Sequence, residues 1–230
     1  MPAITASPAL VPTRVWDLPT RVFHTLLAAC VIGLVITGKL GGNALAWHMR
    51  FGLTVGALLA FRLLWGLIGG HWSRFANFVY SPPAVLRYLR GVPQPHEHFD
   101  AGHNPLGSLS VLALLTVLAL QVTTGLVADD EIATTGPLNR FVSSATASLA
   151  TGWHKGYGQG LVISLVALHL AAIAWYVGRK KQALLRPMWQ GDKPLPPGTP
   201  ASADTGGTRA LAALLAAVCG GLAVWVGRLG

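Results

Sequence analysis

Charged residues are scarce in this chain of 230 residues, and acidic residues are the scarcest of them. Only 11% of the residues are charged, with 17 Lys and Arg against 8 Asp and Glu, whereas 52% are hydrophobic. The mean hydropathy is +0.52. Soluble globular domains carry about 25% charged residues, so this composition excludes that class and indicates a membrane protein.

Disulfide frameworks and the motifs of soluble enzymes are also missing. The two cysteines, Cys30 and Cys219, both fall inside apolar runs, so no disulfide is expected outside the membrane. The sequence has no Cys-x-x-Cys-His, which excludes covalently attached haem. It has no phosphate-binding loop, no Gly-x-Gly-x-x-Gly after a strand and no nucleophilic-serine elbow. Soluble-enzyme chemistry is therefore not expected.

Long apolar runs are what the sequence has instead. Five of them approach the roughly 20 residues that a helix needs to cross a bilayer, at residues 22–38, 51–70, 106–128, 156–178 and 210–227. The alternating pattern of a membrane β-barrel is absent, so the sequence predicts an all-α transmembrane protein. Its predicted parts are an N-terminal tail (1–13), a bundle of four helices (14–184), a cytoplasmic linker (185–208) and a fifth transmembrane helix (209–230). A long outer loop is expected at 129–152.

The distribution of Lys and Arg predicts the orientation of the chain. With the N-terminus in the cytoplasm, most of these residues lie on the cytoplasmic side, and the remainder on the other side are Lys39, Arg50, Arg140, Lys155 and Arg228. The positive-inside rule therefore favours a cytoplasmic N-terminus. The same rule explains the net charge of +9, so nucleic-acid binding is not expected.

The first apolar run also resembles a secretory signal peptide. Arg14 and Arg21 precede it, and Ala44-Leu45-Ala46 imitates a cleavage site. Cleavage would remove His24. Because the run is long for a signal peptide, we predict instead that it is retained as a membrane span.

Four histidines lie at two matched depths in the predicted spans. His154 and His169 are 15 residues apart, which on a helix is a rise of roughly 22 Å and a rotation of about 60°, so both face one side near opposite membrane surfaces. Alternating helix directions then pair His24 with His169 near the cytoplasmic face, and His48 with His154 near the outer face. A membrane interior rarely tolerates an imidazole without a function or a partner.

Haem b fits such pairs, because two axial imidazoles leave the iron no open position and favour electron transfer. Each iron would then have two histidine ligands, His24 with His169 and His48 with His154. Glycines near these histidines offer small faces against which a porphyrin can lie: Gly52, Gly56 and Gly158. The alternative for these glycines is close helix packing through Gly-x-x-x-Gly spacing.

Other polar residues have two interpretations each. His71, at the cytoplasmic end of the second span, is an alternative to His24 as inner ligand, although His24 lies nearer the membrane body. Arg62, within the second span, either extends its charge to the cytoplasmic surface or binds a propionate of the inner haem. Arg50 has the position to neutralise a propionate of the outer haem. His103, before the third span, is either a neighbour of a helix cap or part of a quinone pocket.

Several motifs together resemble a known family. They are RVWDLPTRVFH at 14–24, WH at 47–48, RLLWG at 62–66, GHNPLG at 102–107, WH at 153–154 and LH at 168–169. In this order they are similar to the bacterial cytochrome b561 and nickel-iron hydrogenase b-type cytochrome family, over about residues 14–195. The fifth helix lies outside the shared part.

The resemblance implies a four-helix bundle with two b haems in the bacterial inner membrane, ligated by His24, His48, His154 and His169. It further implies electron transfer between the quinone pool and a periplasmic partner, either a c-type cytochrome or an oxidoreductase subunit. The alternative is a self-sufficient enzyme that oxidises superoxide and reduces ubiquinone, as some family members do. A haem-free scaffold or transporter would leave the four histidines unexplained.

Overall fold

The computed structural model describes residues 9–92, 94, 97–132 and 134–230. Residues 1–8 of the predicted N-terminal tail lie outside the described residues. The elements in chain order are β1 (Val11–Arg14), α1 (Leu18–Leu40), η1 (Gly42–Ala44), α2 (Leu45–Ile68), η2 (His71–Ser73), η3 (Phe75–Asn77), α3 (Pro82–Arg90), α4 (Pro105–Val127), η4 (Asn139–Phe141), α5 (Ser144–Trp153), the π-helix η5 (His154–Gly158), α6 (Gln159–Gly178), α7 (Leu185–Gln190), β2 (Asp192–Leu195) and α8 (Gly206–Gly227).

Five helical segments of the described chain are long and apolar enough to cross a membrane. They are Leu18–Leu40, Gly42–Ile68, Pro105–Val127, Ser144–Gly178 and Gly206–Gly227. The predicted all-α transmembrane class is therefore confirmed.

Two of these helices begin at residues whose side chains satisfy the free amide groups of a first helical turn. Asp17 precedes α1 and accepts a hydrogen bond from the amide of Thr20 at 2.8 Å. Asn104 precedes α4 and accepts one from the amide of Gly107, also at 2.8 Å. Each cap is followed by a proline in the first turn, which has no amide proton to satisfy.

The fourth span starts earlier than its apolar run indicates. Helix α5, the π-helix and α6 follow one another without a break from Ser144 to Gly178. The loop expected at 129–152 is therefore wrong for residues 144–152, which are helical. Their Ser, Thr and Ala composition hides the helix, whose start is marked by the side chain of Ser143 accepting from the amide of Thr146.

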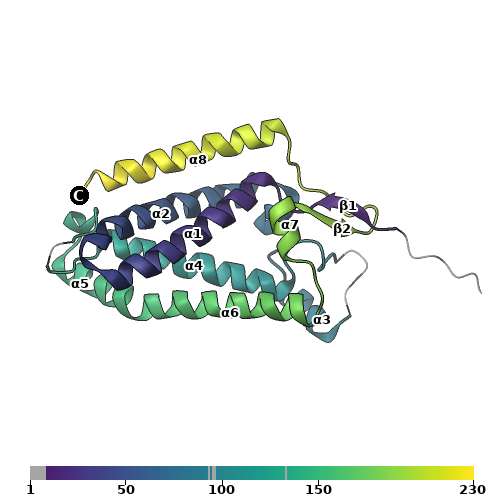
Figure 1. Ribbon diagram of the computed structural model, residues 1–230, viewed down its shortest axis with the longest axis horizontal. Coiled ribbons are helices and arrows are strands. Elements are labelled where there is room, and N and C mark those ends of the chain that lie inside the picture. The colour runs from purple at the N-terminus through teal and green to yellow at the C-terminus, as the bar shows by residue number, and fades with distance from the viewer. Residues whose placement is uncertain (1–8, 93, 95–96, 133) are drawn as a thin grey trace, which may run out of the picture.

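Helices α1, α2, α4 and α6 enclose the main apolar core, and α8 lies along the outside of the bundle against α2 and α1 (Figure 1). The buried side chains of this core come from all four helices: Cys30, Val31, Val55, Leu59, Leu118 and Val162. Val162 on α6 lies between His154 and His169 in the sequence. The core residues of α1 and α2 lie in the middle of each helix, beyond His24 and His48 respectively. The core therefore separates the two ends of the bundle.

A small cap covers the end of the bundle where α1 begins and α6 ends. Strand β1 pairs antiparallel with β2, with Val11 opposite Leu195 and Arg14 opposite Asp192 (Figure 1). The segment after β2 is held against the start of the chain by Ser202, whose hydroxyl donates to the carbonyl of Val15 at 2.7 Å. The range 185–208, predicted as a linker, thus contains α7 and β2 and packs against the start of the chain.

Candidate functional site

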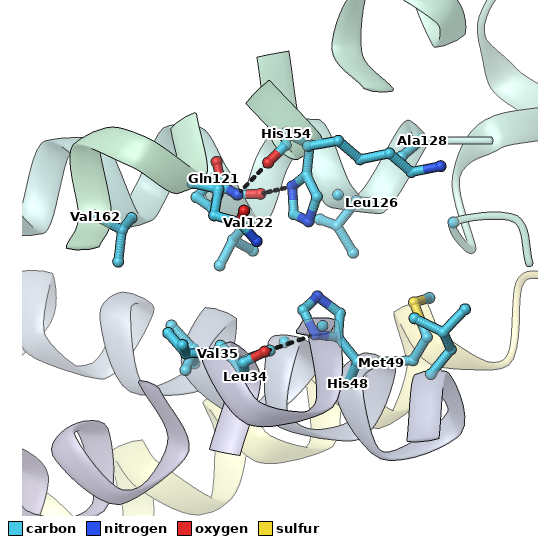
Figure 2. A pocket seen from close by; sticks show the side chains of 18 of the residues that line it. Leu34, Val35, His48, Met49, Gln121, Val122, Leu126, Ala128, His154 and Val162 are labelled. Atoms are coloured by element: carbon cyan, nitrogen blue, oxygen red, sulfur yellow. Dashed lines mark hydrogen bonds between the residues drawn. The ribbon is translucent and has the colours of Figure 1, made fainter. Parts of the chain in front are cut away.

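The imidazoles of His48 and His154 face each other across a cavity at one end of the bundle (Figure 2). Their ring centroids are 6.0 Å apart and the ring planes are nearly perpendicular, at 85°. His48 lies in the first turn of α2, and His154 is the first residue of the π-helix. The structure therefore brings together two histidines that are 106 residues apart in sequence.

Both rings of this pair are held by backbone carbonyl groups. The Nδ1 atom of His48 lies 3.1 Å from the carbonyl oxygen of Leu34, and that of His154 lies 2.9 Å from the carbonyl oxygen of Gln121 (Figure 2). Because a carbonyl oxygen only accepts, Nδ1 carries the proton in each ring. The Nε2 atom keeps its lone pair, which is the arrangement of a metal-binding histidine with a supporting hydrogen bond.

Two glycines make room for these rings, and the sequence analysis missed both. A Cβ atom on Gly125 would lie 2.7 Å from Cε1 of His154, and one on Gly38 would lie 3.1 Å from Cε1 of His48. A side chain at Gly125 would therefore force the imidazole of His154 to move. The sequence does contain one indication of both glycines. Each lies near the end of an apolar run, at the same predicted depth in the membrane as the histidine that it contacts.

The cavity between the two rings has a volume of about 360 Å³. Gly52 lines it, and nothing lies within 4 Å of the place where its Cβ would be, so a flat face is open there. Gly56 instead packs against Val122 of α4, and Gly158 packs against Gln121 and Trp153. Neither glycine is among the residues lining the cavity, and their role beside a haem stays a prediction.

The second pair lies at the opposite end of the same four helices. The ring centroids of His24 on α1 and His169 on α6 are 6.5 Å apart, with an angle of 52° between the ring planes. In the described chain, neither imidazole has a hydrogen bond comparable to those of His48 and His154. His71, the alternative inner ligand, lies in η2 with its ring 4.8 Å from that of Trp72. The ring that faces His169 is therefore that of His24.

Both separations fit two imidazoles that share one metal ion. Two metal–nitrogen bonds of about 2 Å, together with the radius of each ring, place the ring centres about 6 Å apart. The described residues contain no group of three or more His, Cys, Asp or Glu side chains able to hold a metal ion. A metal at either pair therefore needs further ligands from another source, as a porphyrin supplies them.

The His24–His169 end also contains a buried cation that forms no ion pair among the described residues. Arg62 on α2 is only 3% exposed, and its Nη1 atom is buried with no hydrogen-bond partner. Its guanidinium carbon lies 4.8 Å from the ring centre of Phe75. Arg62 therefore does not extend its charge into solvent.

His103 lies at the same end, just before α4. Its ring centre is 4.8 Å from that of Trp16 and 4.7 Å from that of Phe78, and its Nδ1 atom is buried without a hydrogen-bond partner. Burial, together with the positive charge of Arg62, lowers the pKa of His103 to about 3. The ring is therefore neutral at physiological pH. Arg50 is exposed, with its guanidinium carbon 4.8 Å from the ring centre of Trp47, and its role at a propionate of the outer haem stays a prediction.

Comparison with known protein families identifies a family for this chain. The family model described as prokaryotic cytochrome b561 matches residues 15–191, which include all four paired histidines and exclude α8. No curated protein and no solved structure matches the chain. The chain therefore belongs to the prokaryotic cytochrome b561 family, and it is a multi-pass membrane cytochrome that carries b-type haem in electron transfer.

Proposed function

We propose that this chain is a dihaem electron-transfer subunit, with one haem b between His48 and His154 and a second between His24 and His169. It carries electrons across the bacterial inner membrane between a periplasmic redox partner and the quinone pool. The observation that supports this proposal most strongly is the similar spacing of the two pairs, with ring centres 6.0 and 6.5 Å apart.

The orientation predicted from the Lys and Arg distribution assigns the two sites to opposite membrane faces. With a cytoplasmic N-terminus, His48 and His154 form the outer site and His24 and His169 the inner site. The outer site then faces a periplasmic c-type cytochrome or oxidoreductase subunit, and the inner site faces quinone. Fusion of a reporter active only in the periplasm to the end of α8 tests this orientation, which predicts a periplasmic C-terminus.

The residues around each site have separate tasks. Haem b, when bound, supplies a one-electron couple between ferric and ferrous iron. His48 and His154 present their Nε2 atoms because Leu34 and Gln121 hold the opposite ring nitrogens. The apolar core between the sites excludes water and polar groups, which keeps the intervening medium at low dielectric.

The function is tested with the purified full chain in proteoliposomes that contain ubiquinone or menaquinone. A reduced c-type cytochrome is added outside, and haem reduction and quinol formation are followed optically. We expect electrons from the outside to reach quinone in the wild-type protein and to stop when either histidine pair is removed. Quinone reduction that persists without both pairs contradicts the proposal.

A second candidate function is superoxide:ubiquinone oxidoreductase activity without a protein partner. It is favoured by positive charge at the cavity of the His48–His154 pair. Lys155 lines that cavity, and Lys39 donates a hydrogen bond of 2.9 Å to Gln159, another lining residue. Cations beside a narrow opening attract a small anion such as superoxide. Asp130 also lines the cavity, so the charge there is mixed.

The two functions differ in what must be added for quinone reduction. The partner-free enzyme reduces quinone from enzymatically generated superoxide alone, and Lys155→Gln slows it without changing haem content. An electron-transfer subunit reduces no quinone from superoxide alone. It reduces quinone only when its protein partner is added as the electron donor. Conversion of Arg140, on the same side but outside the cavity lining, to Gln is the matched control.

A further inference from the structure

Arg62 is a buried positive charge that forms no ion pair in the described chain, although the charge of Asp17 acts on it from a distance. The guanidinium is held between α2 and the aromatic rings of Phe75 and Phe78, at 4.8 and 5.7 Å from their centres. Gly66, one turn further along α2, lets the ring of Phe75 come this close, because a Cβ there would overlap that ring. The fold thus builds a specific position for the cation while leaving Nη1 unpaired.

The carboxylate whose charge acts on Arg62, that of Asp17, already accepts several other hydrogen bonds. It is 0% exposed, and its carboxylate accepts hydrogen bonds from the amides of Thr20 and Gly70, from the indole of Trp65 and from the hydroxyl of Ser73. Asp17 and Arg62 form no ion pair in the described chain. A buried guanidinium without a directly paired anion is unfavourable, so an anion bound against Nη1 would stabilise this position.

His103 adds a second unpaired nitrogen beside the first. Phe78 contacts both residues, since its ring centre is 4.7 Å from that of His103 and 5.7 Å from the guanidinium carbon of Arg62. His24 and His169 are close enough to His103 for their charges to act on it. The neutral ring of His103 has one N–H group to donate. Among the described residues, two buried nitrogens without a partner, one on α2 and one just before α4, therefore both lie against Phe78, and the charges of the inner histidine pair act on His103.

We propose that Arg62 and His103 together bind a propionate carboxylate of the haem held by His24 and His169. This inference rests on the proposed function, because it requires a haem at that pair. A carboxylate neutralises Arg62 and accepts from both nitrogens. A quinone carbonyl carries no charge and leaves the buried cation uncompensated. The proposal thus assigns His103 to the inner haem instead of the quinone pocket predicted from its sequence position.

The test compares haem b with its dimethyl ester, whose propionates carry no charge. The full chain is produced in a haem-deficient host that is supplied with either compound. The measurement is the rate at which haem leaves the His24–His169 site for an excess of a soluble apo-haem protein, and the His48–His154 site serves as internal reference. Loss of a charge-assisted hydrogen bond changes an equilibrium by about tenfold or more.

The proposal predicts that Arg62→Met speeds loss of haem b from the inner site by at least about tenfold, and that His103→Phe, which keeps the aromatic contacts, speeds it less. Esterification speeds haem loss from the wild-type protein by a similar factor. It has no further effect in the double variant, which combines Arg62→Met with His103→Phe. Arg62→Lys, which keeps the charge, is intermediate. Arg90→Met removes an exposed charge from α3 and leaves the rate unchanged.

Three results overturn the inference. Esterification that speeds haem loss equally in the wild type and the double variant shows that the propionates bind elsewhere. Unchanged haem retention with a raised KM for quinone in His103→Phe shows a quinone pocket instead. Absence of any haem between His24 and His169 in the wild-type chain overturns the proposed function as well, and so is distinguishable from the first two. The double variant is assessed by its haem at the outer site, which reports correct folding.

Discussion

The two histidine pairs have almost the same spacing but different surroundings. At the His48–His154 pair, each imidazole donates to a backbone carbonyl and the space between the rings is an open cavity. At the His24–His169 pair, the imidazoles lack such carbonyl partners in the described chain, and a buried arginine and a neutral histidine lie nearby. The His48–His154 site is thus organised by hydrogen bonds to its two imidazoles, and the His24–His169 site by a charged residue nearby.

This difference has a direct electrochemical consequence. A hydrogen bond from Nδ1 makes the imidazole a stronger electron donor and favours ferric iron, whereas a nearby cation favours ferrous iron. The outer site should therefore have the lower reduction potential and the inner site the higher one. For the proposed function, this order of potentials predicts electron flow from a periplasmic donor toward quinone.

The largest expected effect is the selective loss of one haem when one pair is broken. His154→Ala should reduce the haem content from two per chain to about one, and His169→Ala should do the same at the other site, because each iron loses an axial ligand. The measurement is the pyridine haemochrome assay against protein concentration. His71→Ala, outside both pairs, should retain both haems. Loss of both haems from each single variant, in a protein that remains folded, would argue against independent sites.

A smaller and one-sided effect is expected from the glycine beside His154. Gly125→Val places atoms where the imidazole now lies, since even a Cβ would be 2.7 Å from it. We expect partial loss of the outer haem and full retention of the inner haem, measured by the amplitudes of the two components in a redox titration. Gly160→Val is the control, because nothing lies within 4 Å of its missing Cβ. Equal loss at both sites would show general misfolding instead.

The difference in potential between the sites is the next test of the comparison. A redox titration of the wild-type protein should resolve two components, with the inner haem at least about 59 mV higher, which is a tenfold difference in a one-electron equilibrium. The His154→Ala protein, which should lose the outer haem, assigns the two components, because the component that remains belongs to the inner haem. If the outer haem has the higher potential, the effects assigned here to the carbonyl groups and to Arg62 are not dominant.

The smallest expected difference is spectroscopic. The angle between two axial imidazole planes sets the splitting of the iron d orbitals, and the pairs differ, at 85° and 52°. The ferric outer haem should therefore give the more anisotropic low-spin signal in electron paramagnetic resonance. Signals of equal anisotropy would show that haem binding rotates the rings to a common angle.

Much of the fold follows from the sequence because membrane insertion depends on simple properties. Five apolar runs predict five helices, and cap residues such as Asp17 and Asn104 mark where two of them begin. The start of the fourth span was missed because residues 144–152 are mostly Ser, Thr and Ala rather than strongly apolar. The π-helix at His154 was also not predicted. It adds one residue to a turn, which changes the rotation between His154 and His169 from about 60° to about 40° in the opposite sense, so both still face one side.

The candidate site was predicted as far as helix periodicity and depth allow. These properties select the four histidines, but they do not show which small residues seat the rings. Gly52 was chosen by its spacing from His48, whereas Gly38 and Gly125 belong to other helices and act across the bundle. Arg62 and His103 are likewise 41 residues apart. Their relation through Phe78 depends on tertiary packing that no local pattern encodes.

The most direct test of the central claim is the number and ligation of haems in the purified wild-type chain. Haem analysis combined with electron paramagnetic resonance should show two haem b per protein, both low-spin with two imidazole ligands. A single haem, or a high-spin iron that lacks a second imidazole, would contradict the account of two facing histidine pairs.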